Sequence, residues 1–149
     1  MLKPGCRIGV VSPSYWLKKQ YMEKTSKFFQ DKGYTMVMGN NNSMKWGPFA
    51  GTPQERADDI HHMFSNPKIE AIICARGGYG ANRVLPLLDY NLIRDNPKIF
   101  MGYSDITAYL TSITQKTGLV TFHGPMMVSY KKGFVNYNFQ TMERILNGT

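Results

Sequence analysis

Short, continuous runs of apolar residues recur along the chain and alternate with longer amphipathic stretches. Five such runs occupy residues 8–11, 35–38, 71–75, 99–102 and 120–122. They lack the polar alternation of a half-exposed strand, and continuous runs of this length are typical of strands covered on both faces, as in a parallel sheet. The pattern therefore predicts five buried strands.

Helix signals lie between these runs, and the clearest is at Thr52, Pro53 and Glu55. A capping threonine, a proline at the first helical position and a glutamate three residues after the cap form a capping box. We expect this helix to cover residues 53–64 and to end before Pro67, since proline disfavours helical geometry in the residue that precedes it.

Two more helices are expected over residues 81–88 and 105–116, the second ended by Gly118, which tolerates a positive φ. Strands and helices then alternate along the chain. This order predicts an α/β fold, an open doubly wound and mainly parallel sheet with helices on both faces, as in flavodoxin-like and Rossmann-like three-layer domains. Ligands of such sheets bind outside the carboxyl ends of the strands.

Composition places the chain among soluble single-domain proteins. It has 149 residues, 42% of them hydrophobic, and a domain of this size buries roughly 68–70% of the surface of its unfolded chain. The two cysteines, Cys6 and Cys74, are too few for a disulfide framework, so reduced thiols and a cytoplasmic location are expected. No signal region or run of roughly 20 apolar residues is present, so no membrane partner is expected.

The charge is strongly positive but spread along the sequence. Lys and Arg number 18 against 10 Asp and Glu, a formal net charge of +8. The densest cluster is Lys18, Lys19, Lys24, Lys27 and Lys32, within one segment of helical periodicity. We interpret this cluster as a solvated helix face and expect no nucleic-acid partner.

Four polar or glycine-containing loops follow predicted strands and should meet at one edge of the sheet. They are residues 12–14, 76–80, 103–105 and 123–125. Coincidence would place some turn residues there in any case. From these loops we take Ser12, Arg76 and Tyr79 as candidate substrate-binding residues.

Ser104 is the best candidate for a reacting atom, since it lies between a buried strand and a helix. It could be a nucleophile on a tight strand-to-helix turn, where the helix N-terminus favours developing negative charge. Gly102 precedes it, but Ile106 stands where the hydrolase motif G-x-S-x-G has its second glycine. The alternative is an N-cap, although Thr107 is not the Glu or Gln of a capping box.

The glycine-rich loop at 76–80 has three interpretations. Its backbone N–H groups could cradle a phosphate, but the loop matches neither the dinucleotide fingerprint nor the phosphate-binding loop of NTPases. They could equally form half of an oxyanion hole. A simple tight turn is the third possibility.

The three histidines do not form a metal-binding pattern. His61 and His62 are adjacent on a predicted helix and face different directions, and His123 lies at a strand end. No Cys/His spacing is that of a zinc site. We predict no metal and no cofactor.

Three segments together resemble the LD-carboxypeptidase family of serine peptidases, which includes murein tetrapeptide carboxypeptidases and microcin C immunity peptidases. They are residues 76–83, 97–107 and 121–125. Residues 2–5, 12–14 and 55–59 also fit, so the resemblance extends over nearly the whole chain. Cys6 departs from it, since the family usually has an aspartate there, at the end of the strand remote from the predicted site.

The resemblance implies roles for individual residues. Ser104 would be the nucleophile, and the backbone N–H groups of Gly78 and Asp105 would form the oxyanion hole. The family's catalytic Glu and His come from a C-terminal domain, and His123 matches a His-Gly-Pro segment rather than the catalytic histidine. Residues 1–149 would then be the N-terminal domain only, inactive alone.

We therefore expect the N-terminal part of a serine carboxypeptidase that hydrolyses an LD-peptide, such as a murein tetrapeptide, or a related amide next to a free carboxylate. The alternatives are a non-catalytic binding or assembly domain and a nucleotide-binding domain. Expected partners are a small peptide substrate, the missing C-terminal domain, and a second copy or other partner bound through exposed apolar surface.

Overall fold

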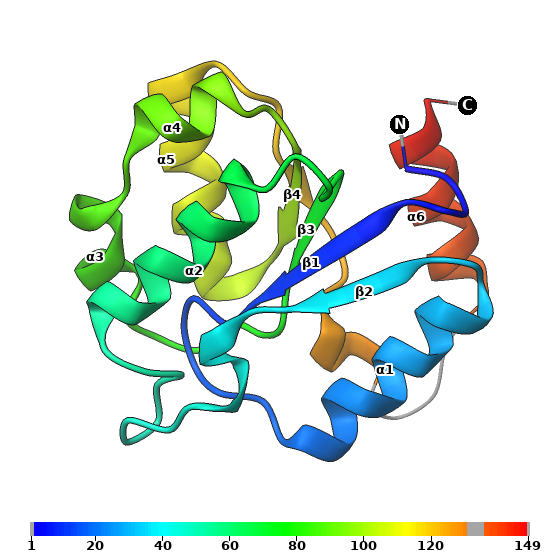
Figure 1. The fold of residues 1–149 in the computed structure, drawn as a ribbon, viewed down its shortest axis with the longest axis horizontal. Coiled ribbons are helices and arrows are strands. Elements are labelled where there is room, and N and C mark those ends of the chain that lie inside the picture. Colours follow the sequence, from blue (N-terminus) through cyan, green and yellow to red (C-terminus); the bar gives the residue numbers. More distant parts are fainter. Residues whose placement is uncertain (1, 131–135, 149) are drawn as a thin grey trace.

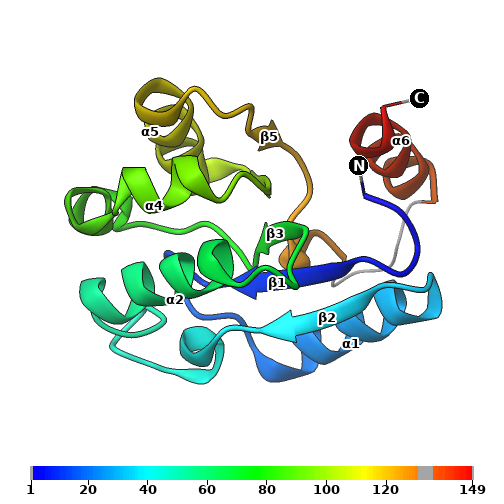
Figure 2. The same ribbon diagram turned by 45° about the horizontal axis from the view of Figure 1, so that its top comes forward.

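Five parallel strands form the central sheet, in the order β2-β1-β3-β4-β5 (Figure 1; β5 is labelled in Figure 2). They are β1 (Arg7–Val11), β2 (Thr35–Met38), β3 (Ala71–Cys74), β4 (Ile99–Gly102) and β5 (Phe122–His123). The computed structural model describes residues 2–130 and 136–148. From β1 the chain runs to one neighbour, β2, and then crosses to the other, β3, so the order reverses between β1 and β3. The predicted doubly wound α/β sheet is confirmed.

Helices cover both faces of this sheet (Figures 1 and 2). The first face carries α1 (Lys19–Asp31) and α6 (Asn136–Asn147), and the second carries α2 (Pro53–Ser65), α3 (Ala81–Val84), α4 (Tyr90–Asp95) and α5 (Thr107–Thr117). Alternate strand residues point to opposite faces. Val10 and Ile73 accordingly pack with Phe29 of α1, whereas Val11 and Ile72 pack with Phe64 of α2.

Both ends of the described chain lie on the first face. Figures 1 and 2 show the N-terminal residues beside α6. Leu2 N–H donates to Leu146 O at 3.1 Å, and the Tyr34 hydroxyl donates to Glu143 Oε1 at 2.6 Å. Phe139 adds an edge-on contact with Phe29 at 5.8 Å between ring centroids. These contacts fix α6 against α1 and the start of β2.

The capping box at the start of α2 is present as predicted. Thr52 Oγ1 accepts from Glu55 N–H at 3.3 Å, and Glu55 Oε2 accepts from Thr52 N–H at 2.8 Å. The Thr52 hydroxyl also donates to Glu55 Oε2, at 2.9 Å, and the two hydrogen bonds that this carboxylate accepts from Thr52 lower the pKa of Glu55. The predicted end of α5 is present as well, since Gly118 follows the helix with a φ of 78°.

The expectation of one helix over 81–88 is wrong in its extent. The α-helix ends at Val84 and continues as a 3-10 turn over Leu85–Leu87, because Pro86 has no N–H to donate. The chain then starts α4, which the sequence analysis missed. Asp89 caps it by accepting from Asn91 N–H and Leu92 N–H, both at 3.0 Å.

The last strand also differs from its prediction. The expected strand at 120–122 is replaced by a two-residue strand, Phe122–His123, paired with the end of β4. Val120 is 72% exposed. An edge strand has one neighbour only, so burial constrains its register weakly.

The structure agrees with the expectation of a solvated lysine cluster and of cysteines without a disulfide. Every lysine of the cluster at 18–32 is exposed, and Cys6 and Cys74 are buried free thiols. Burial raises the pKa of Cys74, which makes it inert. In residues 2–130 and 136–148, none of the helices has the length and apolar character to cross a membrane.

Candidate active site

Ser104 stands at the carboxyl end of β4 in a conformation unusual for serine. Its φ is 63°, in the left-handed region, and among the described residues no other non-glycine residue has a positive φ. Such a conformation costs roughly 1–2 kcal/mol. Ser104 is exposed and begins a 3-10 turn, Ser104–Ile106, that leads into α5. The strained turn therefore presents the hydroxyl to solvent at the sheet edge.

The N-cap interpretation of Ser104 is wrong. Tyr103 occupies the cap position of the 3-10 turn and Ile106 that of α5, and neither end has a side-chain cap hydrogen bond. In the part of the chain that the structure describes, Ser104 Oγ has no hydrogen-bond partner. Its hydroxyl is free to react.

Gly77 lies directly against this serine. A Cβ atom added at Gly77 would lie 2.9 Å from Ser104 Cβ, 3.0 Å from Ser104 Oγ and 3.3 Å from Asp105 N. Real Cβ atoms essentially never approach other atoms closer than 3.0 Å. The loop after β3 can therefore lie this close to the serine only because residue 77 is glycine.

Gly78 follows the glycine that lies against Ser104, and Asp105 follows Ser104 itself. Gly78 is exposed, with φ 146°, and its loop packs on the Tyr15 ring, since a Cβ at Gly78 would lie 2.4 Å from Tyr15 Cγ. The backbone N–H groups of Gly78 and Asp105 have no acceptor within the described residues. An oxyanion hole requires free donors of this kind close to the nucleophile, and this role stays a prediction for Gly78 and Asp105.

The Asp105 side chain joins three of the loops. Its Oδ2 atom accepts a hydrogen bond from Ser14 Oγ at 2.6 Å and another from Ala81 N–H at 3.2 Å. Ser14 follows β1, and Ala81 begins the helix after the glycine loop. The carboxylate therefore holds the loops after β1, β3 and β4 together, a role that the sequence analysis did not foresee.

A buried arginine donates hydrogen bonds to backbone carbonyl groups of two of these loops. Arg56, on α2, has no exposed surface, and its Nη1 donates to Pro13 O at 2.8 Å and to Gly80 O at 3.5 Å. The Tyr109 hydroxyl donates to the same Pro13 oxygen at 2.8 Å. Burial lowers the pKa of Arg56, and the nearby Tyr109 and Asp105 oppose that shift.

The sequence contains a signal for this arginine. Arg56 precedes Ile60 and Met63 by four and seven residues, so it lies on the apolar face of α2. A charged residue on an apolar helix face must find buried acceptors. The sequence does not show that these acceptors are carbonyl groups of the site loops.

The three candidate substrate-binding residues have different surroundings. Ser12 is fully buried, and its hydroxyl donates to Asn42 Oδ1 at 2.6 Å. Tyr79 is 58% exposed on the glycine loop. Arg76 is half-buried, with Nε donating to Gly77 O at 3.1 Å. A substrate contact from any of them stays a prediction, and the positions of Arg76 and Tyr79 favour it more than that of Ser12.

No histidine is hydrogen-bonded to the serine hydroxyl within the described residues. His62 is exposed, and His61 Nε2 accepts from Asp89 N–H at 2.9 Å. The His123 ring lies 6.1 Å from the Tyr103 ring, centroid to centroid, and no hydrogen bond joins it to Ser104 within the described residues.

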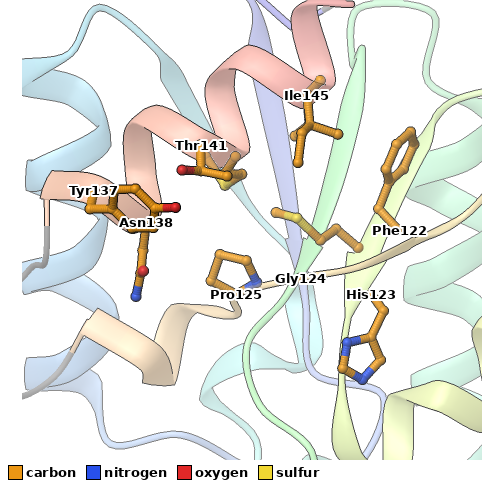
Figure 3. Close-up of a pocket in the computed structure, with 11 residues that line it drawn as sticks. Phe122, His123, Gly124, Pro125, Tyr137, Asn138, Thr141 and Ile145 are labelled. Carbon is orange, nitrogen blue, oxygen red and sulfur yellow. The ribbon is translucent and has the colours of Figure 1, made fainter.

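His123 also borders a groove of about 270 Å³ between β5 and α6. Figure 3 shows Thr141 and Ile145 of α6 on one side of this groove and Phe122 on the other, with the His123 ring directed away from the helix. The groove is lined mainly by apolar side chains and lies beside the His-Gly-Pro segment.

Comparisons with known proteins identify the relatives of this chain. The model of the LD-carboxypeptidase N-terminal domain matches residues 8–124. A probable murein peptide carboxypeptidase of Bacillus subtilis is 40% identical over 126 residues, which cover 85% of this chain and 40% of the relative. The microcin C7 self-immunity protein MccF of Escherichia coli is 43% identical over 130 residues, covering 85% of this chain and 38% of the relative.

A solved structure shares the fold as well. MccF in complex with glutamyl sulfamoyl guanosine superposes with a TM-score of 0.93 at 34% identity, covering 97% of this chain and 45% of the other. The chain thus spans about two fifths of the length of the curated relatives it matches. Because the family model matches well over half of the sequence, the chain belongs to the LD-carboxypeptidase family and corresponds to its N-terminal domain.

Proposed function

We propose that this chain is the nucleophile-bearing part of a serine-type LD-carboxypeptidase. Ser104 is the nucleophile, and the N–H groups of Gly78 and Asp105 form the oxyanion hole. The bond cleaved is an amide next to a free carboxylate, as at the end of an LD-linked peptide. The relatives named murein peptide carboxypeptidase and MccF support this reaction class.

One observation carries the proposal. Ser104, alone among the described non-glycine residues, holds a positive φ, and it does so at the end of a central strand with a glycine loop packed against its Oγ. Strain of this kind persists where the surrounding structure enforces it, and it concentrates at functional sites. A loop that served only as a connection would not need a strained, exposed serine.

The chemistry follows from this arrangement. Ser104 Oγ attacks the amide carbonyl carbon while a base takes the hydroxyl proton, and the carbonyl oxygen becomes an oxyanion held by the two N–H groups. The C–N bond then breaks, and the departing amine takes the proton. Water attacks the resulting ester, which releases the acid and restores the hydroxyl.

The base is the missing part of this scheme. In residues 2–130 and 136–148 no histidine or carboxylate is hydrogen-bonded to Ser104 Oγ, and a serine hydroxyl is a weak nucleophile without a base. We propose that a second, C-terminal domain supplies a Glu–His pair. On this proposal residues 1–149 alone bind substrate weakly and turn it over negligibly.

The test compares this chain alone with the chain joined to the part of the Bacillus subtilis relative that lies beyond the matched region. Release of the terminal D-amino acid from an LD-linked tetrapeptide is measured. We expect turnover only in the joined protein, and a fall of at least about 1,000-fold in Ser104→Ala.

Ser65→Ala is the matched control, since Ser65 is exposed at the end of α2 and donates only to His62 O. Its rate should equal that of the parent. Undiminished hydrolysis by Ser104→Ala would overturn the nucleophile assignment. Turnover by the 149-residue chain alone would overturn the proposal that its base lies elsewhere.

A further inference from the structure

A second pocket opens at the carboxyl ends of β1 and β3, between which the strand order reverses. It measures about 370 Å³ and is lined by residues that follow these two strands, notably Tyr15, Trp16, Lys18 and Arg76. In doubly wound sheets the crevice at such a reversal is a common place for a ligand. The pocket is separate from the groove between β5 and α6.

The charged side chains that line this pocket, within the described part of the chain, are both cations. Arg76 is half-buried, lies over the Tyr15 ring at 5.5 Å, and uses Nε to donate to Gly77 O. Neither Arg76 nor Lys18 forms an ion pair with a carboxylate of the described residues. The terminal guanidinium nitrogens of Arg76 therefore remain available to a ligand.

These features favour an oxyanion. A guanidinium offers two parallel N–H donors to a carboxylate or phosphate, and partial burial strengthens the attraction. Stacking on Tyr15 and the bond to Gly77 O hold the group in place, so little side-chain entropy is lost on binding. Lys18, at the start of α1, adds a second positive charge.

The pocket is connected to the reaction centre by two short chain segments. Arg76 is followed directly by Gly77, which lies against Ser104. Tyr15 packs on Gly78, and its neighbour Ser14 donates to Asp105. Arg76 and Tyr15, which line the pocket, are therefore each one residue along the chain from a residue that contacts Ser104 or Asp105.

We propose that this pocket is a subsite for an anionic group of the substrate, a carboxylate or a phosphate, held by Arg76 and assisted by Lys18. The identification of the ligand as substrate rests on the proposed function, but the anion site itself does not. It makes the chain selective for acidic ligands and supplies binding that does not depend on Ser104.

The test uses the 149-residue chain and two probes, glutarate for a carboxylate and inorganic phosphate for a phosphate. Affinities are measured by isothermal titration at low salt. We expect millimolar binding of at least one probe, weakened at least tenfold in Arg76→Gln and about threefold in Lys18→Gln. Arg76→Lys, which keeps the charge but not the paired donors, should recover part of the loss.

Lys45→Gln is the matched control. Lys45 lies 4.3 Å from the centre of the Trp16 ring but does not line this pocket, so its loss tests the effect of general positive charge. Binding should stay within twofold of the parent. The probe that binds more tightly identifies the chemical source of the anion. Equal binding by Arg76→Gln and the parent, or an equal loss in Lys45→Gln, would overturn the subsite.

Failure of this proposal can be told apart from failure of the proposed function. Ser104→Ala should bind the probes like the parent, since its hydroxyl takes no part in the pocket. If the joined protein does not need Ser104, the peptidase proposal fails while Arg76-dependent anion binding can still stand. If Arg76 is dispensable for both probes, the subsite fails whatever the peptidase assay gives.

Discussion

Ser104 and Gly77 show how much of the candidate site depends on single backbone positions. A serine at φ 63° is tolerated because β4 on one side and the helical turn on the other hold it there. Gly77 completes the arrangement, since its missing side chain leaves the space that Ser104 Cβ and Oγ occupy. Its place between a strand and a helix made Ser104 the candidate, and the resemblance to peptidases implied its role as nucleophile, but neither showed its backbone conformation.

We expect Gly77→Ala to damage the site without replacing any reacting atom. The new methyl group would meet Ser104 and Asp105 N at 2.9–3.3 Å and displace them. Overpacking of this kind costs about 1–3 kcal/mol, and a small misplacement of a nucleophile can cost about 100-fold in rate. Urea unfolding of the chain and the peptidase rate of the joined protein measure the two effects.

Gly124→Ala is a suitable comparison because its methyl group would meet only the flexible Met101 side chain, with Sδ at 2.7 Å. It should lose less stability and much less activity. If both variants kept the parent rate, close packing of Gly77 on Ser104 would not matter for catalysis.

At the level of elements, the loops after β1, β3 and β4 act as one unit. Asp105 accepts from Ser14 and Ala81, and Pro13 O accepts from Arg56 and Tyr109. The sequence placed these loops at one edge of the sheet correctly, because parallel strands end there together. It did not predict which side chains would join them, since these hydrogen bonds connect residues 24 to 96 positions apart.

Ser14→Ala should therefore lower stability more than an average serine substitution. The variant removes a buried donor to a carboxylate, and hydrogen bonds to charged groups contribute about 1.5–3 kcal/mol. We expect the free energy of unfolding in urea to fall by that amount, together with the peptidase rate of the joined protein.

Ser26→Ala removes a hydroxyl that donates to Met22 O within α1. Because that carbonyl belongs to the helix ladder, the loss should stay within about 0.5 kcal/mol. Equal losses in Ser14→Ala and Ser26→Ala would contradict a special role for the link between Ser14 and Asp105.

For the whole molecule, buried tyrosines on both faces of the sheet determine the response to alkali. Burial raises the pKa of Tyr34, Tyr109 and Tyr130 above the ordinary value of 10.0, and the hydrogen bond to Glu143 adds to the shift at Tyr34. The unfolded chain then ionises first. Their contribution to stability is complete below pH 10 and is lost as the pH rises above it.

We expect the free energy of unfolding to fall above pH 10 by up to about 1.4 kcal/mol per pH unit for each of these tyrosines. Tyr109→Phe should be less stable at pH 7, because it lacks the bond to Pro13 O, but should lose stability less steeply above pH 10. Urea midpoints measured from pH 7 to 11 test this.

Tyr137→Phe is the control, since Tyr137 is 72% exposed. The urea midpoint of this variant should equal that of the parent at every pH from 7 to 11. If the free energy of unfolding fell equally steeply above pH 10 in Tyr109→Phe and in the parent, ionisation of Tyr109 would not contribute to the loss of stability in alkali.

Local pattern was sufficient for most of the fold. Continuous apolar runs predicted the positions of four strands closely, and the capping box at Thr52 predicted α2, because both signals depend on neighbouring residues. The expected burial of β2 was wrong, since β2 is an edge strand with no buried residue. Prediction failed where local signals were short or in conflict. The helix expected over 81–88 changes to a 3-10 turn at Pro86, and the edge strand β5 begins later than expected. Helix α4 was missed because its cap, Asp89, comes soon after that 3-10 turn.

The sequence by itself determined the α/β class, the edge of the sheet that carries the site, and Ser104 as the candidate nucleophile. Only the tertiary structure decided that Ser104 is strained and uncapped, that Gly77 lies against its hydroxyl, and that Arg76 and Lys18 share a pocket free of carboxylates among the described residues. The reason is physical. Periodicity and capping act between residues a few positions apart, whereas a site forms from segments that only the folded sheet brings together.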